Sequence, residues 1–186
     1  MTATRPDHAS PWVFDTRKLG RRAGAMQQVH LSVPAKGPIG IEVIGVPPGE
    51  PVDLDLRLES VTEGVWVSGS ASARAVGTCS RCLVDLEQPV ATALRDLYVY
   101  PGSTTDQTTD DDELPRVSDD QIDLEPLVRD ELVLAMPLVP LCKPDCAGLC
   151  PDCGERLEEL EPGHTHEILD PRWAALRDRF GVADEN

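Results

Sequence analysis

The sequence predicts an α+β fold, with an antiparallel β-sheet in the N-terminal half and helices in the C-terminal part. Two patterns indicate this division: apolar and charged residues alternate over residues 52–59, and apolar residues recur at helical spacing over residues 123–136. Aromatic residues make up only 4% of the 186 residues. The core must therefore rely on Val, Leu and Ile, which favours a sheet because branched side chains fit a pleated surface.

Strands joined by hairpins account for the N-terminal half. The strict alternation over 52–59 is the period of a strand with one face buried and the other in water. Pro89 marks a break within the last of the strands, because proline has no backbone N–H to donate. Besides 52–59, the expected strands are residues 29–33, 39–46, 65–71 (with small residues as far as Gly77) and 84–100.

An acidic stretch separates the two halves. Residues 102–121 hold seven carboxylates and one basic group, Arg116. Such a composition buries too little apolar surface to order a chain, so we expect a mobile linker. The predicted organisation is a basic N-terminal arm and sheet over 1–101, this linker over 102–121, and a helical, metal-binding part over 122–186.

Two helices are expected in the last part. The first begins at Asp123 as N-cap, carries an apolar stripe of Leu124, Leu127, Val128, Leu132 and Ala135, and ends at Pro137. The second begins at Asp170-Pro171, a cap followed by proline at the first helical position. Its apolar stripe consists of Trp173, Leu176 and Phe180.

Charge is distributed unevenly along the chain. The net charge is −16, which argues against a broad nucleic-acid-binding face. Residues 1–36 carry a net +4, and the remainder carries −20. Arg17, Lys18, Arg21 and Arg22 of the basic arm could bind phosphate, but four charges in a mobile arm are equally well solvated, so direct contact with nucleic acid is left open. No secretory signal or membrane-spanning run is visible, and we expect a cytoplasmic protein.

Six cysteines fall in three closely spaced pairs: Cys79 and Cys82, Cys142 and Cys146, Cys150 and Cys153. In a reducing compartment such pairs indicate metal ligands before disulfides. Zinc is bound by thiolate and imidazole in a tetrahedron, and a short turn can supply two of the four ligands. We therefore expect the C-terminal part to be a zinc-stapled tail, with Cys79 and Cys82 presented at a hairpin tip.

His164 and His166 raise the number of candidate ligands to eight, enough for two tetrahedra. The favoured pairing puts Cys79, Cys82, Cys142 and Cys146 in one site, and Cys150, Cys153, His164 and His166 in the other. A competing arrangement surrounds one ion with the four cysteines of residues 142–153 and leaves Cys79 and Cys82 as a free dithiol. Thiolates dominate among these ligands and the ligands fill whole tetrahedra, which is typical of structural zinc.

Catalytic motifs are not found. The chain has no glycine-rich phosphate loop, no His-Glu metalloprotease helix and no serine elbow, and we expect neither enzymatic activity nor a small-molecule substrate. A redox role for Cys79 and Cys82 is conceivable because Arg81 can lower a thiol pKa. Redox pairs normally open a helix, however, whereas strands are expected on both sides here.

The cysteine segments and their surroundings resemble a known family. The resemblance rests on residues 79–83, 124–132, 137–142, 146–154 and 170–176, which are similar to the YceD-like family, also called large ribosomal RNA subunit accumulation proteins. It implies a role in accumulation or maturation of large-subunit rRNA without known catalysis. Many relatives carry Cys-x-Cys where this chain has His164-Thr165-His166.

The resemblance also implies a partner. Members are often encoded beside a small zinc-ribbon-type protein of the large subunit, and a strongly acidic surface suits a basic ribosomal protein or large-subunit precursor. The first hypothesis is thus a non-enzymatic ribosome-biogenesis factor. The second is a thiol-based redox or zinc-responsive sensor.

Overall fold

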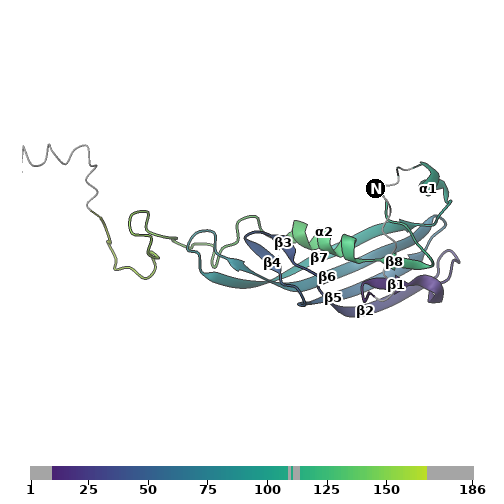
Figure 1. The fold of residues 1–186 in the computed structure, drawn as a ribbon, viewed down its shortest axis with the longest axis horizontal. Helices are drawn as coiled ribbons and strands as arrows, with labels where there is room; N and C mark the ends of the chain where they lie inside the picture. The colour runs from purple at the N-terminus through teal and green to yellow at the C-terminus, as the bar shows by residue number, and fades with distance from the viewer. Residues whose placement is uncertain (1–9, 109, 111–113, 167–186) are drawn as a thin grey trace, which may run out of the picture.

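A long antiparallel sheet forms the body of the protein (Figure 1). The computed structural model describes residues 10–108, 110 and 114–166. Within them, six strands form this sheet in the order β2-β5-β6-β4-β3, with β7 on the other side of β6, and two short strands, β1 and β8, form a separate pair. The elements are β1 (Val13–Asp15), η1 (Thr16–Lys18, a 3₁₀ helix), β2 (Met26–Pro34), β3 (Ile39–Ile41), β4 (Ile44–Val46), β5 (Pro51–Ser60), β6 (Gly64–Thr78), β7 (Asp85–Val99), α1 (Thr104–Thr108), β8 (Gln121–Asp123) and α2 (Glu125–Ala135).

The predicted antiparallel sheet is confirmed, and β5 shows why the pattern was informative. Its even-numbered residues from Val52 to Ser60 are buried, while the odd-numbered ones mostly face water. It pairs with β2 on one side and β6 on the other. The alternation of the sequence is thus the alternation of the two faces of the sheet.

Two of the expected strands differ in detail. Residues 39–46 form a hairpin of two short strands, β3 and β4, because residues 42 and 43 form a turn. Pro89 does not interrupt β7, which runs unbroken and pairs with β6 from Asp85 to Val99. Among the described strands β7 pairs with β6 alone, so β7 is an edge strand at Pro89, and an edge tolerates a residue without an N–H.

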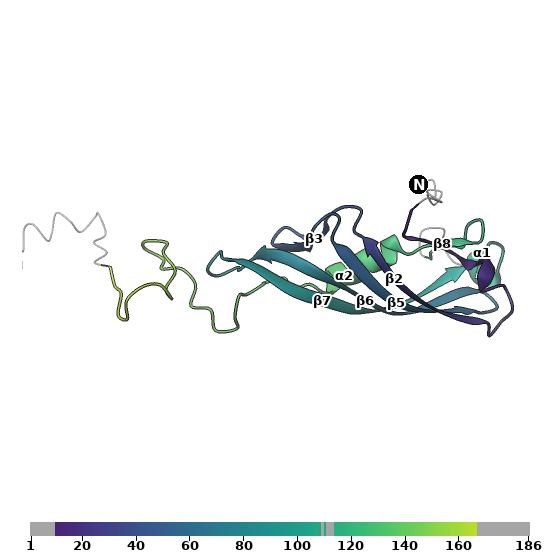
Figure 2. The same ribbon diagram turned by 90° about the horizontal axis from the view of Figure 1, so that it is seen from below.

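Helix α2 covers one face of the sheet (Figures 1 and 2). It contacts β7, β6 and β3. Val128 and Leu132 are fully buried against the sheet, as predicted, whereas Ala135 is exposed and Met136 takes its place. Ala71 and Ala75 are also buried, and such short side chains let the helix approach the strands closely. The opposite face of the sheet is covered by neither α1 nor α2 (Figures 1 and 2).

The start of α2 differs by one residue from the prediction. Leu124 is the N-cap and makes no side-chain capping bond, while the Asp123 carboxylate accepts a hydrogen bond from the Glu125 N–H at 3.0 Å. Pro137 follows the C-cap, as expected from its missing donor. The second predicted helix, residues 170–180, lies outside the described residues.

The stretch predicted as a mobile acidic linker has structure in its described residues. Arg116 pairs with Asp106 of α1 at 2.6 Å, and Val117 is buried and bonds through its N–H to the carbonyl of Val99. Ile122 of β8 is fully buried as well. The composition of 102–121 is unfavourable for order, but these contacts with the body of the protein supply what the local sequence lacks.

The segment after residue 9 is part of the fold rather than a free arm. Trp12 is 1% exposed, and its indole N–H donates to the carbonyl of Pro34 at 2.9 Å. Strand β1 pairs with β8, which joins the start of the described chain to the segment before α2. These N-terminal elements lie at one end of the sheet, and the hairpin of β6 and β7 points to the other (Figures 1 and 2).

Candidate metal centres

The first cluster begins at the tip of the longest hairpin. Cys79 and Cys82 lie between β6 and β7, as predicted. The tip is closed by backbone hydrogen bonds from Cys79 N–H to the carbonyl of Val84 and from Leu83 N–H to the carbonyl of Cys79, at 2.8 and 2.9 Å. Leu83 adopts a positive φ of 58°, which completes the tight turn. Cys79 is fully buried and Cys82 is 8% exposed.

The segment that leaves α2 supplies the other two sulfurs. It runs beside the hairpin tip, because the Ser80 N–H donates to the carbonyl of Pro140 at 2.9 Å. The Arg81 guanidinium donates to the carbonyl of Cys146, also at 2.9 Å, across 65 positions of sequence. Cys142 and Cys146 are thereby brought to the sulfurs of the hairpin.

The four sulfurs lie close enough together to share one metal ion. They all lie within 4.8 Å of one another. The Sγ atoms of Cys79 and Cys146 are 3.8 Å apart, and those of Cys82 and Cys142 are 3.6 Å apart. Zinc–sulfur bonds of about 2.3 Å give a tetrahedral edge of about 3.8 Å, whereas a disulfide would need about 2.05 Å. The donor set and its spacing therefore fit zinc.

The surroundings shift the pKa values of the cysteines in this cluster in opposite directions. The pKa of Cys79 is lowered to about 6, chiefly because the backbone N–H of Cys142 donates to its sulfur, with further N–H donors at Cys82 and Arg81. Desolvation of its sulfur raises the pKa of Cys142 to about 12, and desolvation also raises that of Cys146. These backbone N–H groups thus favour the thiolate form of Cys79, and a divalent cation would displace protons from the other thiols.

The second cluster follows four residues later. Cys150 and Cys153 lie on a turn in which the Gly154 N–H donates to the carbonyl of Cys150 at 2.9 Å, with φ of 75° at Gly154. The ligand atoms of Cys150, Cys153, His164 and His166 lie within 4.8 Å of one another. Hydrogen bonds from the backbone N–H groups of Cys153 and Asp152 lower the pKa of Cys150.

In the second cluster, one distance between ligand atoms fits a zinc tetrahedron and another does not. Cys153 Sγ and His164 Nε2 are 3.6 Å apart, the edge of about 3.6 Å expected between a thiolate and an imidazole on zinc. The two Nε2 atoms of His164 and His166 are 2.6 Å apart, shorter than the about 3.3 Å edge expected for two imidazoles. The two rings must separate before both could bind one ion.

A family comparison bears on the same part of the chain. The model of a family described as "Large ribosomal RNA subunit accumulation protein YceD" matches residues 67–178. That range is more than half of the chain and contains every candidate ligand.

The chain belongs to the YceD family.

Curated relatives extend the similarity along the chain. An uncharacterized protein of Mycobacterium tuberculosis is 50% identical over 173 residues, covering 93% of this chain and 83% of the relative. One of Mycobacterium leprae is 44% identical, covering 91% and 77%. The uncharacterized protein YlbN of Bacillus subtilis is 29% identical, covering 73% and 78%. No solved structure matches the chain.

In this YceD-family protein, the two groups of four brought together are those of the favoured sequence pairing. In the competing arrangement Cys79 and Cys82 form a free dithiol, but here their sulfurs lie beside those of Cys146 and Cys142. Sequence reasoning missed the hydrogen bond from Ser80 to Pro140 and the role of Arg81 as a connection between segments. Nothing in the local pattern of either segment indicates these two hydrogen bonds.

The four basic residues of the N-terminal segment are not equally available. Arg17 is paired with Asp15, and Arg21 is paired with Asp120 at 2.8 Å and lies over the ring of Tyr100. Lys18 and Arg22 are exposed. An ion pair lowers the net positive field that a phosphate would experience, so only part of the predicted basic surface is free of acidic partners.

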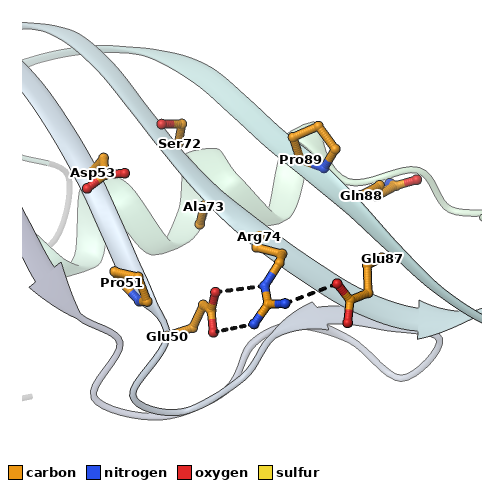
Figure 3. Close-up of a pocket in the computed structure, with 9 residues that line it drawn as sticks. All are labelled: Glu50, Pro51, Asp53, Ser72, Ala73, Arg74, Glu87, Gln88 and Pro89. Atoms are coloured by element: carbon orange, nitrogen blue, oxygen red, sulfur yellow. Dashed lines mark hydrogen bonds and ion pairs between the residues drawn. The ribbon is translucent and has the colours of Figure 1, made fainter.

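A separate hollow of about 550 Å³ lies on the open face of the sheet, away from the cysteines (Figure 3). Arg74 is held there by Glu50 and Glu87, at 2.9 and 3.0 Å. The remaining lining residues are Pro51, Asp53, Ser72, Ala73, Gln88 and Pro89. The guanidinium is thus engaged on both sides by carboxylates.

No helix of the described residues is long and apolar enough to cross a membrane.

Proposed function

We propose that this protein is a non-enzymatic, cytoplasmic ribosome-biogenesis factor that supports accumulation of large-subunit rRNA. Its membership of a family described as large ribosomal RNA subunit accumulation proteins is the observation that carries this proposal. The candidate metal centres agree with it, because eight ligands for two ions leave no open position at which a substrate could be activated.

In this proposal the first cluster holds a structural zinc ion. The ion supplies a cross-link of four thiolates. Cys79 and Cys82 then hold the hairpin tip, and Cys142 and Cys146 hold the segment that leaves α2, closing a loop of 60 residues or more. Joining such distant segments costs conformational entropy, which metal binding offsets. Cys150, Cys153, His164 and His166 would hold a second ion, which would join residues 150–153 to residues 164–166.

The acidic body is proposed to bind a basic ribosomal protein or a large-subunit precursor. Opposite charges favour encounter and exclude acidic partners. Direct contact with rRNA is proposed only for the N-terminal end, through Lys18 and Arg22 and through Arg17 and Arg21 where phosphate displaces their carboxylates. No small-molecule substrate is part of the proposal.

Depletion of the protein followed by profiling of ribosomal subunits tests the function. Large-subunit rRNA should fall relative to small-subunit rRNA, and the wild-type gene should restore it. A C79S/C146S variant should restore it poorly, since it lacks two ligands of the first cluster. An R95A variant, changed at an exposed position of β7, serves as the matched control. Unchanged large-subunit rRNA on depletion would refute the proposal.

A thiol-based redox or zinc-responsive sensor is the second candidate, favoured by the lowered pKa of Cys79. Oxidation requires a thiolate that an oxidant can reach. In the first cluster these properties are separated: Cys79 is fully buried, and the exposed Cys142 has a pKa raised to about 12. Mild peroxide should therefore leave the thiols of a zinc-loaded protein intact. Rapid formation of a Cys79–Cys82 disulfide would favour the sensor.

A further inference from the structure

Large apolar side chains are exposed around the first cysteine cluster. Seven large hydrophobic residues of the described chain are exposed, and four of them belong to the hairpin tip or to the end of α2 and the segment after it. We call these four the tip patch: Leu83, Leu134, Leu138 and Val139, with exposures of 64%, 79%, 81% and 62%. Single exposed leucines are ordinary, but several on two segments joined by a hydrogen bond indicate an interaction surface.

The tip patch joins two segments that are distant in sequence. Leu83 follows Cys82 directly, and Leu138 and Val139 precede Pro140, whose carbonyl accepts the Ser80 N–H at 2.9 Å. The same two segments meet at the sulfurs of Cys82 and Cys142, 3.6 Å apart. The arrangement of the patch thus depends on the contacts that build the first cluster.

The conformation of Leu83 supports a role for its side chain. Its φ of 58° lies in the left-handed region, where glycine is relaxed and a leucine is strained. Its side chain is exposed, so no packing within the described part of the fold offsets this strain.

Charge around the tip patch decides what could cover it. Residues 79–87 and 121–166 together hold twelve carboxylates and four basic groups, a net of −8. Three of the basic groups are ion-paired, Arg129 with Glu125, Lys143 with Glu158 and Arg156 with Glu159, and the fourth, Arg81, donates to the carbonyl of Cys146. Four thiolates on a divalent ion would add two negative charges. A second copy of this chain carries the same charge and would be repelled, whereas a cationic partner is attracted.

We propose that the tip patch is the docking surface for a lysine- and arginine-rich protein segment with an apolar anchor, and that docking requires metal in the first cluster. The inference rests on the proposed function and specifies its partner and its binding surface. Apolar side chains of the partner cover Leu83, Leu138 and Val139, and its cations face the carboxylates that flank them. Metal loss separates the two halves of the patch and abolishes docking.

Binding to the proteins that high salt releases from purified large subunits provides the test. Full-length zinc-loaded protein is immobilised, bound proteins are identified by mass spectrometry, and the affinity of each purified binder is measured. We expect a basic protein whose affinity falls at least 10-fold in the L83S/L138S/V139S variant and after chelation. M26S is the matched control, because Met26 is 57% exposed but lies on β2. The variants are compared by circular dichroism and zinc content.

The outcomes separate this inference from the proposed function. The docking surface would be overturned if the triple variant bound with the same affinity as the wild type, or if no basic protein bound. Patch-dependent binding of large-subunit rRNA alone would overturn it as well. So would a dimer in light scattering that the triple substitution dissolves. Depletion that lowers large-subunit rRNA, together with full rescue by the triple variant, would refute the docking surface and leave the proposed function standing.

Discussion

The guanidinium of Arg81 donates a hydrogen bond to the backbone carbonyl of Cys146 at 2.9 Å. One residue comes from the tip between β6 and β7, and the other from the chain beyond α2. Groups that hold metal ligands in position commonly contribute to affinity even though they do not touch the metal. We therefore expect Arg81 to act as a positioning residue for the first cluster.

Arg81→Ala should weaken zinc binding at the first cluster by about 10- to 100-fold, the range typical of lost outer-shell contacts. The hydrogen bond to Cys146 is lost, so the segment carrying Cys142 and Cys146 is held less firmly. Competition with a chromophoric chelator measures the affinity. R95A, an exposed arginine of β7, should bind zinc as the wild type does. Equal affinities for the two variants would contradict the positioning role.

Gly148→Ala should lower the free energy of unfolding by about 1–2 kcal/mol, which is the penalty for an L-residue in the left-handed region. Gly148 has φ of +84°, and an added Cβ would lie 3.3 Å from the carbonyl oxygen of Arg81. The substitution should therefore weaken zinc binding as well. Gly49→Ala isolates the first effect, because Gly49 has φ of +81° and no heavy atom within 4 Å of the added Cβ. Denaturant unfolding and chelator competition separate the two effects, and zinc affinity lowered equally in both variants would contradict the contact.

The fold was largely predictable where neighbours in sequence determine it. The alternation of residues 52–59 and the helical spacing of Leu124, Val128 and Leu132 each record which side chains face the core. The errors arose where tertiary contacts decide. Pro89 is tolerated because β7 is an edge strand, and Val117 is ordered because β7 offers it a hydrogen-bonding partner.

The candidate ligands could be predicted from the sequence, but the hydrogen bonds that bring their segments together could not. The spacing of cysteines and histidines within each segment reflects what a turn can present to one ion, so a pairing could be proposed from sequence. The bonds that bring the segments together, Ser80 to Pro140 and Arg81 to Cys146, use backbone carbonyls. Every residue carries a carbonyl, so these acceptors leave no trace in the sequence.

Asp106→Asn should destabilise the region around α1 at neutral pH and have little effect in acid. The carboxylate accepts hydrogen bonds from the Gly102 N–H at 2.8 Å and from Arg116 at 2.6 Å, which lower the pKa of Asp106. A carboxylate whose pKa is lower in the folded state than in the unfolded state stabilises the fold. This stabilisation is complete at a pH above the unfolded pKa of about 4. That stabilisation disappears as the pH falls through the folded value.

Thermal unfolding of wild type and D106N over a range of pH checks this expectation. The difference in Tm should be constant from neutral pH down to about pH 5 and should close below about pH 4. D53N removes an exposed carboxylate of β5 that forms no ion pair among the described residues, and it should leave Tm nearly unchanged. A difference for D106N that persists in acid would show that the carboxylate's charge is not the cause.

Leu132→Ala should lower the free energy of unfolding by about 2–5 kcal/mol, because Leu132 is fully buried between α2 and the sheet and its truncation leaves a cavity. Leu134→Ala, two residues along the same helix, should change it by no more than about 0.5 kcal/mol, since Leu134 is 79% exposed. Both substitutions favour the helix equally, so the difference measures burial alone. Urea unfolding of the zinc-loaded protein measures both. A cost for Leu134→Ala near that of Leu132→Ala would mean that the tip patch is already covered within the free protein, in which case it could not receive a partner.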